Sequence, residues 1–304
     1  MYYHSFNEEM RARFGRRMYK VALDGGFTCP TRDGTLGTRG CVFCSGRGSG
    51  DFTFAGEDLV RQLEYGAALI AHKNRGGGII AYFQSFTGTY APAEELRRRY
   101  GPVFRHPLTD VLSIATRPDC LPDETVALLA EMNREKPVWV ELGLQTIHPA
   151  SAAYIRRGYD LPAYDDAVRR LKAAGLEVIA HTILGLPGET PEDMAATAQY
   201  VGSSGADGVK LQLLHVLKGT DLAEDYAAGR FEAMTPEAYF NAVSLCLEHL
   251  PPRVTIHRMT GDGAKADLIA PLWSADKKRV WNALQTHLRL HDVRQGSALT
   301  GSEN

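Results

Sequence analysis

The segment Cys29-Pro30-Thr31-Arg32-Asp33-Gly34-Thr35-Leu36-Gly37-Thr38-Arg39-Gly40-Cys41-Val42-Phe43-Cys44 holds three of the five cysteines in this chain of 304 residues. Cys41 and Cys44 form a C-x-x-C pair, whereas Cys120 and Cys246 are isolated farther along the sequence. Three thiolates without a nearby fourth suit an iron–sulfur cluster with one open iron, because a closed zinc site needs a fourth Cys or His. An open iron can accept an atom of a substrate or cofactor.

Spacing alone leaves two other interpretations open. A zinc site could recruit one of the ten histidines as a distant fourth ligand. The C-x-x-C pair could also be a redox pair, although that motif follows a first strand directly and needs no upstream cysteine. Glycines at 34, 37 and 40 favour the cluster, because they let the backbone wrap closely around a compact group.

Around this segment, short apolar stretches alternate with amphipathic ones. Thr190-Pro191 and Thr235-Pro236 each combine an N-cap residue with proline at the first helical position, and Gly175 is a typical helix end. The pattern predicts strands at 20–23, 78–83, 111–115, 138–144, 176–184, 208–214 and 254–256, and helices at 57–72, 122–134, 164–174, from 190, 235–250 and 275–290. Apolar strands separated by helices predict an α/β fold with a parallel sheet covered by helices.

We expect one catalytic domain over 20–264, a basic N-terminal extension over 1–19 and a basic helical C-terminal extension over 265–304. The net charge of −2 gives no overall attraction to nucleic acid. Basic clusters are nevertheless present, and they are either solvated faces or contacts for an anionic partner: Arg11, Arg13, Arg16, Arg17 and Lys20; Arg97, Arg98, Arg99 and Arg105; Lys277, Lys278, Arg279, Arg289 and Arg294. The short apolar stretches, the polar N-terminus and the odd number of cysteines predict a cytoplasmic protein without a membrane span.

A series of motifs between about residues 20 and 260 resembles the radical SAM superfamily. The similarity is to the branch that includes the elongator catalytic subunit and, more closely, the bacterial YhcC/YtqA-type proteins. The cysteine spacing of this chain differs from the C-x3-C-x-φ-C motif of most members, because the gap between Cys29 and Cys41 is longer. Longer first gaps are a feature of this branch. The motifs occur in family order: the cysteine segment, Tyr82–Tyr90, Thr116–Asp119, Glu141–Gln145, Arg157-Gly158, His181–Gly188 and Lys210–Thr220.

The resemblance implies a partial (βα)6 parallel barrel of radical SAM type. Cys29, Cys41 and Cys44 would hold a [4Fe–4S] cluster whose fourth iron binds S-adenosylmethionine (SAM). Reductive cleavage of SAM would give a 5′-deoxyadenosyl radical, with electrons from a donor such as flavodoxin or ferredoxin. The branch also points to tRNA as the partner, with modification at carbon 5 of a wobble uridine or on its side chain.

Candidate SAM-binding residues follow the expected strands, because reactive groups of such barrels lie at the carboxyl ends of strands. Gln84 and Ser85 replace the glycine-rich turn that meets the methionine amino group, although strand-end capping is an alternative. Gln145 follows the expected strand 138–144, and Gly185 and Gly188 follow the expected strand 176–184, where the glycines allow close approach to adenosine or form an ordinary turn.

Three further candidates lie within apolar strands, and a fourth follows one. Glu141 must be paired if buried, either to SAM or in a salt bridge with Arg117 or Arg157. His181 is a SAM contact or a satisfied core histidine. Lys210, expected to be catalytic, needs an anionic partner such as the methionine carboxylate, the substrate or Glu141. Arg117 itself is a candidate cofactor contact at the end of the third strand.

Two other function classes remain open from sequence. One is radical modification of a small metabolite or a protein side chain. The other is a non-enzymatic iron–sulfur or zinc-binding partner of a larger complex. Production of 5′-deoxyadenosine after anaerobic reconstitution separates an enzyme from such a scaffold.

Overall fold

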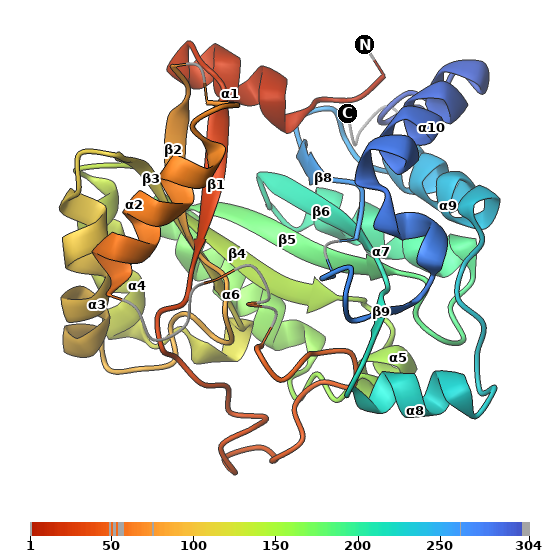
Figure 1. The fold of residues 1–304 in the computed structure, drawn as a ribbon, viewed down its shortest axis with the longest axis horizontal. Coiled ribbons are helices and arrows are strands. Elements are labelled where there is room, and N and C mark those ends of the chain that lie inside the picture. Colours follow the sequence, from red (N-terminus) through yellow and green to blue (C-terminus); the bar gives the residue numbers. More distant parts are fainter. Residues whose placement is uncertain are drawn as a thin grey trace.

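The computed structural model describes residues 2–48, 50, 53, 58–74, 76–261 and 263–299. Its elements alternate between strand and helix through most of the chain (Figure 1). They are α1 (Phe6–Phe14), β1 (Met18–Leu23), α2 (Leu59–Ile70), β2 (Gly78–Phe83), α3 (Ala93–Arg105), β3 (Thr109–Thr116), η1 (Pro118–Cys120), α4 (Asp123–Asn133), β4 (Val138–Gln145), α5 (Pro149–Tyr154), α6 (Leu161–Ala173), β5 (Glu177–Leu184), α7 (Pro191–Ser203), β6 (Gly208–Leu213), β7 (Val216–Leu217), α8 (Asp221–Ala227), α9 (Pro236–Glu248), β8 (Thr255–Arg258), β9 (Leu268–Ala270), η2 (Leu272–Ala275) and α10 (Lys277–Leu290).

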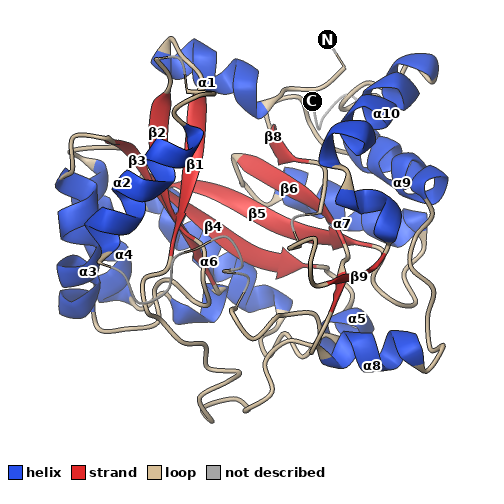
Figure 2. Cartoon of the chain, in the orientation of Figure 1, coloured by secondary structure: helices blue, strands red, loops and turns tan. Residues whose placement is uncertain are grey.

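The main sheet has seven strands in the order β1-β2-β3-β4-β5-β6-β8, and every neighbouring pair is parallel. It curls into an incomplete barrel, with helices on its outer side (Figure 2). The predicted α/β class and partial parallel barrel are therefore confirmed. Six strands follow chain order directly, and β8 adds a seventh at the edge beside β6.

Alternation along the strands separates an apolar outer face from a polar inner face. In β6, Val209 and Leu211 join the main hydrophobic core between sheet and helices. Lys210 lies between these two residues and Gln212 follows them, and both line a cavity on the inner side of the sheet. Because successive strand residues face opposite sides of a sheet, one strand supplies both core and site. This arrangement brings polar residues from several strands to one place.

Helix α1 closes the amino-terminal end of the barrel. It starts with a capping box of Ser5 and Glu8 and ends at Gly15, whose φ of 68° suits glycine. Met10 is fully buried in a separate apolar cluster with inward-facing strand residues, including Trp139 and Ile179. The sequence analysis treated this segment only as a basic extension, because its arginines obscured the short apolar face.

Helix α3 was also not predicted, because arginines and the internal Pro102 interrupt its pattern. Its buried stripe comprises Leu96, Tyr100, Val103 and Phe104, which lie at helical spacing. The adjacent arginines pair within the protein: Arg97 with Glu131, and Arg98 and Arg99 with Glu95. This basic cluster is therefore a solvated face, one of the two interpretations from sequence.

The predicted helix starts at Thr190 and Thr235 are confirmed, since both threonines cap their helices. Helix α6 begins earlier than expected, because Asp160 caps it one turn before the apolar pattern. The predicted helix 57–72 corresponds to α2, while Glu57 lies outside the described residues.

The C-terminal segment is tied to the barrel. Strand β9 pairs antiparallel with β7, and α10 packs on α9. The division at 264 and 265 stays a prediction. None of the described helices has the length and apolar content that a membrane crossing requires.

Candidate functional site

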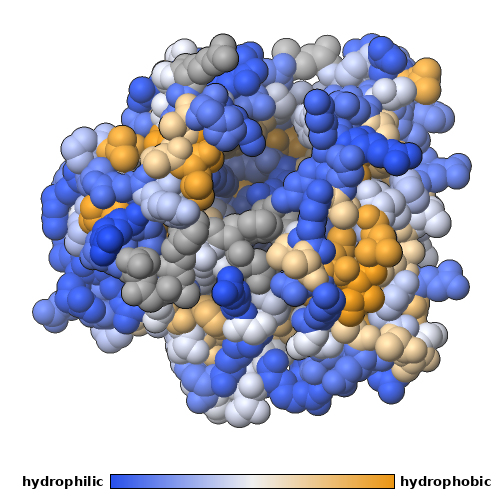
Figure 3. Space-filling view, viewed as in Figure 1, coloured by the Kyte–Doolittle hydropathy of each residue, from blue (hydrophilic) through white to orange (hydrophobic). Residues whose placement is uncertain are grey.

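A cavity opens at the carboxyl ends of the strands and encloses about 1010 Å³ of atom-free space, including solvent at its mouth. The space-filling view shows a hollow near the centre of this face, with hydrophilic side chains around it (Figure 3). The cavity brings together nine predicted site residues: Cys29, Cys41, Cys44, Gln84, Arg117, Glu141, Gln145, His181 and Lys210. Ser85, Gly185 and Gly188 are not among the described residues that line it.

The cysteine loop is folded around the side chain of Arg32. The Arg32 guanidinium donates to the backbone carbonyls of Cys44 at 2.9 Å and Ser45 at 2.8 Å. Gly40 has a φ of 72°, and a β-carbon there would lie 2.7 Å from Arg32 Nε. Glycine is therefore required at position 40 for both backbone conformation and space. The loop positions its cysteines through backbone contacts to one partly buried cation.

The same loop is clamped between α5 and α8. The Val42 amide donates to the Ile155 carbonyl at 3.3 Å, and the Leu222 amide donates to the Val42 carbonyl at 3.0 Å. Asp221, the first residue of α8, forms ion pairs with Arg39 of the loop and with Arg156 after α5. Segments far apart in sequence thus fix the backbone that carries Cys41.

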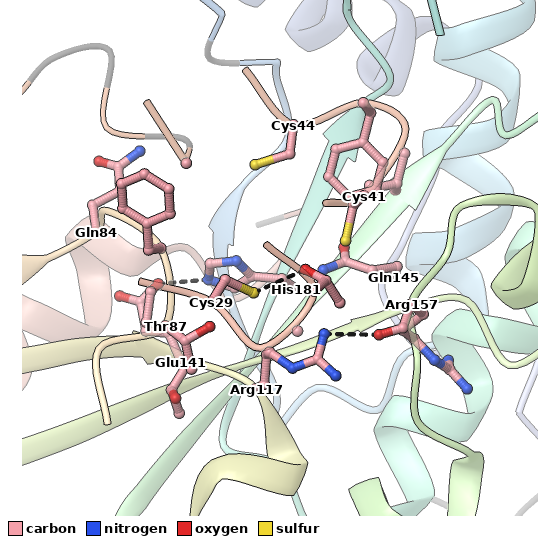
Figure 4. A pocket seen from close by; sticks show the side chains of 18 of the residues that line it. Cys29, Cys41, Cys44, Gln84, Thr87, Arg117, Glu141, Gln145, Arg157 and His181 are labelled. Carbon is pink, nitrogen blue, oxygen red and sulfur yellow. Dashed lines mark hydrogen bonds and ion pairs between the residues drawn. The ribbon is translucent and has the colours of Figure 1, made fainter. Parts of the chain in front are cut away.

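The three thiols face one shared space. Figure 4 shows the sulfur atoms of Cys29, Cys41 and Cys44 directed toward the same part of the cavity. Burial, together with the nearby Cys44 and Cys29, raises the pKa of Cys41 to about 12. A thiol in this setting ionises when a metal centre compensates its charge. Within the described residues, no three His, Cys, Asp or Glu side chains are placed to hold a single metal ion.

The residues present fit a [4Fe–4S] cluster. Its chemistry needs three thiolate donors around a space wider than one ion, with access for a further ligand. The cavity provides three thiols on one wall and continues past them toward β4 and β6. Cys29, Cys41 and Cys44 are therefore the residues that would hold the cluster.

Glu141 lies at the centre of a buried polar network on the inner face of the sheet. Its carboxylate accepts from Lys20 Nζ at 2.5 Å, His181 Nε2 at 2.6 Å and Ser113 Oγ at 2.6 Å, and it forms an ion pair with Lys210. Burial alone would raise the pKa of Glu141, but Lys20 and Lys210 hold it well below the usual value. The carboxylate is thus ionised and fully engaged within the protein.

The partners of Glu141 have shifted pKa values as well. Burial lowers the pKa of Lys210 to about 7, with Lys20 adding to the effect and Glu141 opposing it. Burial also lowers the pKa of His181 to about 4, so its imidazole is neutral near pH 7 and donates from Nε2 to Glu141. Of the two interpretations of His181, the satisfied histidine describes these contacts.

The expected alternative pairing of Glu141 with Arg117 or Arg157 is wrong. Arg117 pairs with Asp119 and donates to the Arg157 carbonyl at 2.8 Å. Arg157 donates to the carbonyls of Leu144 and Thr146 and so fixes the end of β4. Both arginines therefore bind groups near the carboxyl ends of the strands. Glu141 lies deeper in the barrel, where it contacts Lys20 of β1 and Lys210 of β6.

Several carboxamides face the cavity without protein partners. The side chains of Gln84, Gln145 and Gln212 make no hydrogen bond to any described residue, and all three line the cavity. Such groups are available to a bound cofactor or substrate.

Other predicted residues lie outside the cavity lining. Ser85 is buried against Thr53, with 3.3 Å between the hydroxyls, and Met234 packs against Gly185. The SAM-binding roles of Gln84, Ser85, Arg117, Glu141, Gln145, His181, Gly185 and Gly188, and the catalytic role of Lys210, stay predictions.

Among the cavity or network residues that sequence reasoning missed are Lys20, Gln212 and Arg258. Lys20 and Gln212 lie in predicted strands, and their signal was a polar residue at an alternate, inward position. Arg258 lies at the end of β8, beyond the predicted strand 254–256. Its position opposite Lys210 follows from strand pairing, which the sequence does not reveal.

Comparisons with known proteins identify the family of this chain. The "Radical SAM superfamily" model matches residues 35–201, and the "Radical_SAM C-terminal domain" model matches 206–289. The chain is 44% identical to the uncharacterized protein YtqA of Bacillus subtilis, over 97% of this chain and 92% of that protein. It is 37% identical to protein YhcC of Escherichia coli, over 97% and 94%.

More distant similarity links the chain to elongator proteins. It is 30% identical to Elongator complex protein 3 of Schizosaccharomyces pombe, over 50% of this chain and 28% of that protein. An Elp3 from the archaeon Methanocaldococcus infernus shares the fold, with a TM-score of 0.69 and 18% identity, over 91% of this chain and 64% of that one. This chain belongs to the radical SAM superfamily, whose enzymes use a [4Fe–4S] cluster and SAM.

Proposed function

We propose that this radical SAM enzyme modifies a wobble uridine of tRNA, at carbon 5 of the base or on the side chain attached there. The observation that carries the proposal is the charge of the cavity. Among the described residues that line it, one is acidic, Glu141, and five are basic: Arg32, Arg117, Arg157, Lys210 and Arg258. Such a lining favours a substrate with anionic groups, as every nucleotide has.

The position of the basic residues refines this argument. Arg32 contacts the cysteine loop, and Arg117 lies close enough to Cys29 to feel its charge. These two face the cluster. Lys210 and Arg258 lie on β6 and β8 instead. Lys210 is paired with Glu141, so Arg258 is the residue that adds positive charge to this part of the cavity lining.

With both cofactors bound, an external electron donor would let the cluster cleave SAM reductively, and this would supply radical chemistry that removes hydrogen from the substrate. The protein's own residues position the reactants and exclude water. Cys29, Cys41 and Cys44 hold the cluster, and Gln84 and Gln145 offer hydrogen bonds to SAM. The Glu141 network keeps the floor of the cavity charged and ordered.

Two arginines of the basic N-terminal extension pair with acidic residues at the amino ends of the strands. Arg13 pairs with Glu177 at the start of β5, and Arg16 pairs with Asp110 near the start of β3. Helix α1 therefore lies at the amino ends of the strands, away from the cysteine loop (Figure 1). The proposal rests on the cavity lining and on the elongator similarity.

Two measurements test the proposal. Anaerobically reconstituted protein should convert SAM to 5′-deoxyadenosine in the presence of a reductant, and the Cys44→Ala variant should not. Nucleoside analysis of tRNA from a strain lacking the gene should show loss of one modified uridine and accumulation of its precursor. The wild-type gene should restore the profile and the Cys44→Ala gene should not. An unchanged nucleoside profile would favour a small metabolite or protein side chain as the substrate.

A further inference from the structure

Arg117 and Asp119 form an ion pair between the cysteine site and the surface of the protein. They follow β3, and their side chains have exposures of 9% and 24%. Arg117 lines the cavity that contains the three cysteines. Asp119 is not among the described residues that line that cavity, and it lines a separate cavity at the surface instead. The pair is therefore oriented, with its cation toward the cysteines and its anion toward the surface.

The guanidinium of Arg117 is held by the protein on several sides. Its Nε and Nη2 donate to the two carboxylate oxygens of Asp119 at 2.9 and 2.7 Å. Its Nη1 donates to the Arg157 carbonyl at 2.8 Å (Figure 4). The centre of the Tyr159 ring lies 4.8 Å from the guanidinium carbon. A bidentate pair fixes the plane of the guanidinium, and an aromatic face stabilises the cation. Arg117 is thus fixed in place beside the cysteines.

Arg117 stays charged in this position and acts on the thiols. Burial alone would lower the pKa of Arg117, but the hydrogen bonds with Asp119 raise it above its usual value. Burial and the neighbouring thiols raise the pKa of Cys41, and Arg117 is the charged group that opposes that rise most strongly. The same guanidinium also interacts with Cys29 through its charge. One fixed cation therefore favours negative charge at two of the three cluster ligands.

Charge close to an iron–sulfur cluster changes its reduction potential. Reduction transfers one electron from an external donor to the cluster, which then carries one more negative charge. A nearby cation stabilises this reduced form, and the effect is larger where little water screens the interaction. A nearby anion has the opposite effect, which weakens with distance and exposure. Because the cation of the pair faces the cysteines and the anion faces the surface, the pair as a whole favours reduction.

We propose that the oriented pair of Arg117 and Asp119 sets the reduction potential of the cluster: Arg117 raises the potential, and Asp119 limits that rise. The inference concerns electron uptake by the cluster. It goes beyond the proposed function, because reduction of the cluster precedes the reaction whatever the substrate is. It gives a role to a buried arginine whose three nitrogens all have partners within the protein.

Redox titration of the anaerobically reconstituted protein without SAM, followed by electron paramagnetic resonance of the reduced cluster, measures the potential. Arg117→Gln removes the cation, so the equilibrium constant for one-electron reduction should fall about tenfold, which lowers the potential by about 59 mV. Asp119→Asn removes the anion but keeps an oxygen that accepts from Arg117, so the potential should rise. Arg117→Lys keeps the charge and should stay closer to the wild-type potential than Arg117→Gln does.

Arg170→Gln is the matched control. Arg170 pairs with Asp123 and Asp166 and lines the surface cavity, but it is not among the described residues that line the cysteine cavity. Its replacement should leave the potential unchanged.

Iron content, measured in parallel, separates a change in potential from loss of the cluster. If Arg117→Gln does not retain iron, the rise expected in Asp119→Asn decides the question alone. Wild-type potentials in both variants, or shifts of the same sign, would overturn the proposal, because a structural role alone does not shift the potential in opposite directions. The titration uses no substrate, so this proposal and the proposed tRNA substrate can fail separately.

Discussion

Lys210 and Glu141 form an ion pair inside the barrel, with side-chain exposures of 3% and 0%. They come from β6 and β4, and His181 from the intervening β5 also donates to the same carboxylate. The pair lines the buried floor of the cavity, where each charge depends on the other for stabilisation. The polar side chains on β4, β5 and β6 are therefore electrostatically coupled on the inner face of the sheet.

The coupling predicts how substitutions combine. Glu141→Gln leaves Lys20 and Lys210 without their shared counter-charge, so it should lower the free energy of unfolding by roughly 3–5 kcal/mol. The double variant Glu141→Gln/Lys210→Met should recover part of that loss, because one uncompensated charge is removed. Anaerobic urea unfolding of the two single variants and the double variant measures the interaction. Strictly additive losses would show that the two residues are not coupled.

The three-cysteine site predicts a site-differentiated cluster. Anaerobically reconstituted protein should bind about four irons per chain, and replacing Cys29, Cys41 and Cys44 together with Ala should remove them. Replacing Cys120, which does not line the cavity, should leave iron content unchanged. Stoichiometric zinc that persists through reconstitution without iron uptake would refute this prediction.

Asp221 should stabilise the cluster without contacting it. It pairs with Arg39 and Arg156, and the Arg156 carbonyl lies 3.8 Å from the Cys41 sulfur. Asp221→Asn should therefore release the loop and increase the rate of iron loss to a chelator about tenfold. Glu224→Gln, on an exposed position of the same helix, serves as the control. Equal rates in both variants would mean that α8 does not support the cysteine loop.

His181 should make the protein less stable at mildly acidic pH. Its pKa is lowered from 6.5 to about 4, so between these values the unfolded chain binds a proton that the folded protein does not. Stability should therefore fall as the pH decreases from about 6.5 to 4, by up to about 3 kcal/mol from this residue. His181→Gln should flatten that part of the profile, measured by anaerobic urea unfolding across the range. An unchanged slope would assign the pH dependence to other groups.

The start of α10 is a candidate contact for the tRNA backbone, because Lys277, Lys278 and Arg279 are all exposed. Replacing all three with Glu should weaken tRNA binding at low salt and reduce the salt dependence by about one unit of log–log slope per lost phosphate contact. SAM cleavage should be unaffected. The variant Arg97→Glu/Arg98→Glu on α3 controls for general charge effects. Unchanged tRNA affinity in the triple variant would return these residues to the solvated-face interpretation.

The sequence by itself was sufficient for the strand–helix alternation, the helix starts at Thr190 and Thr235, and the three-cysteine motif. These features are local, because hydrophobic periodicity, N-caps and ligand spacing each depend on residues within a short stretch of sequence. Family motifs in order extended them to a partial barrel. Local signals failed where arginines and Pro102 obscured α3, and where Ser5 and Glu8 cap a helix within a basic segment.

The tertiary structure decided which polar groups meet. From sequence, Glu141 could contact SAM or pair with Arg117 or Arg157, and it was one of three possible partners of Lys210. In the structure it pairs with Lys210 of β6 and with Lys20 of β1, which the sequence did not predict. Curling of the sheet brings these strands around a common interior, and strand register then sets which alternate residues face each other. The meeting of Gln212 and Arg258 in the cavity wall has the same origin, because it depends on long-range pairing between β6 and β8 that no single segment encodes.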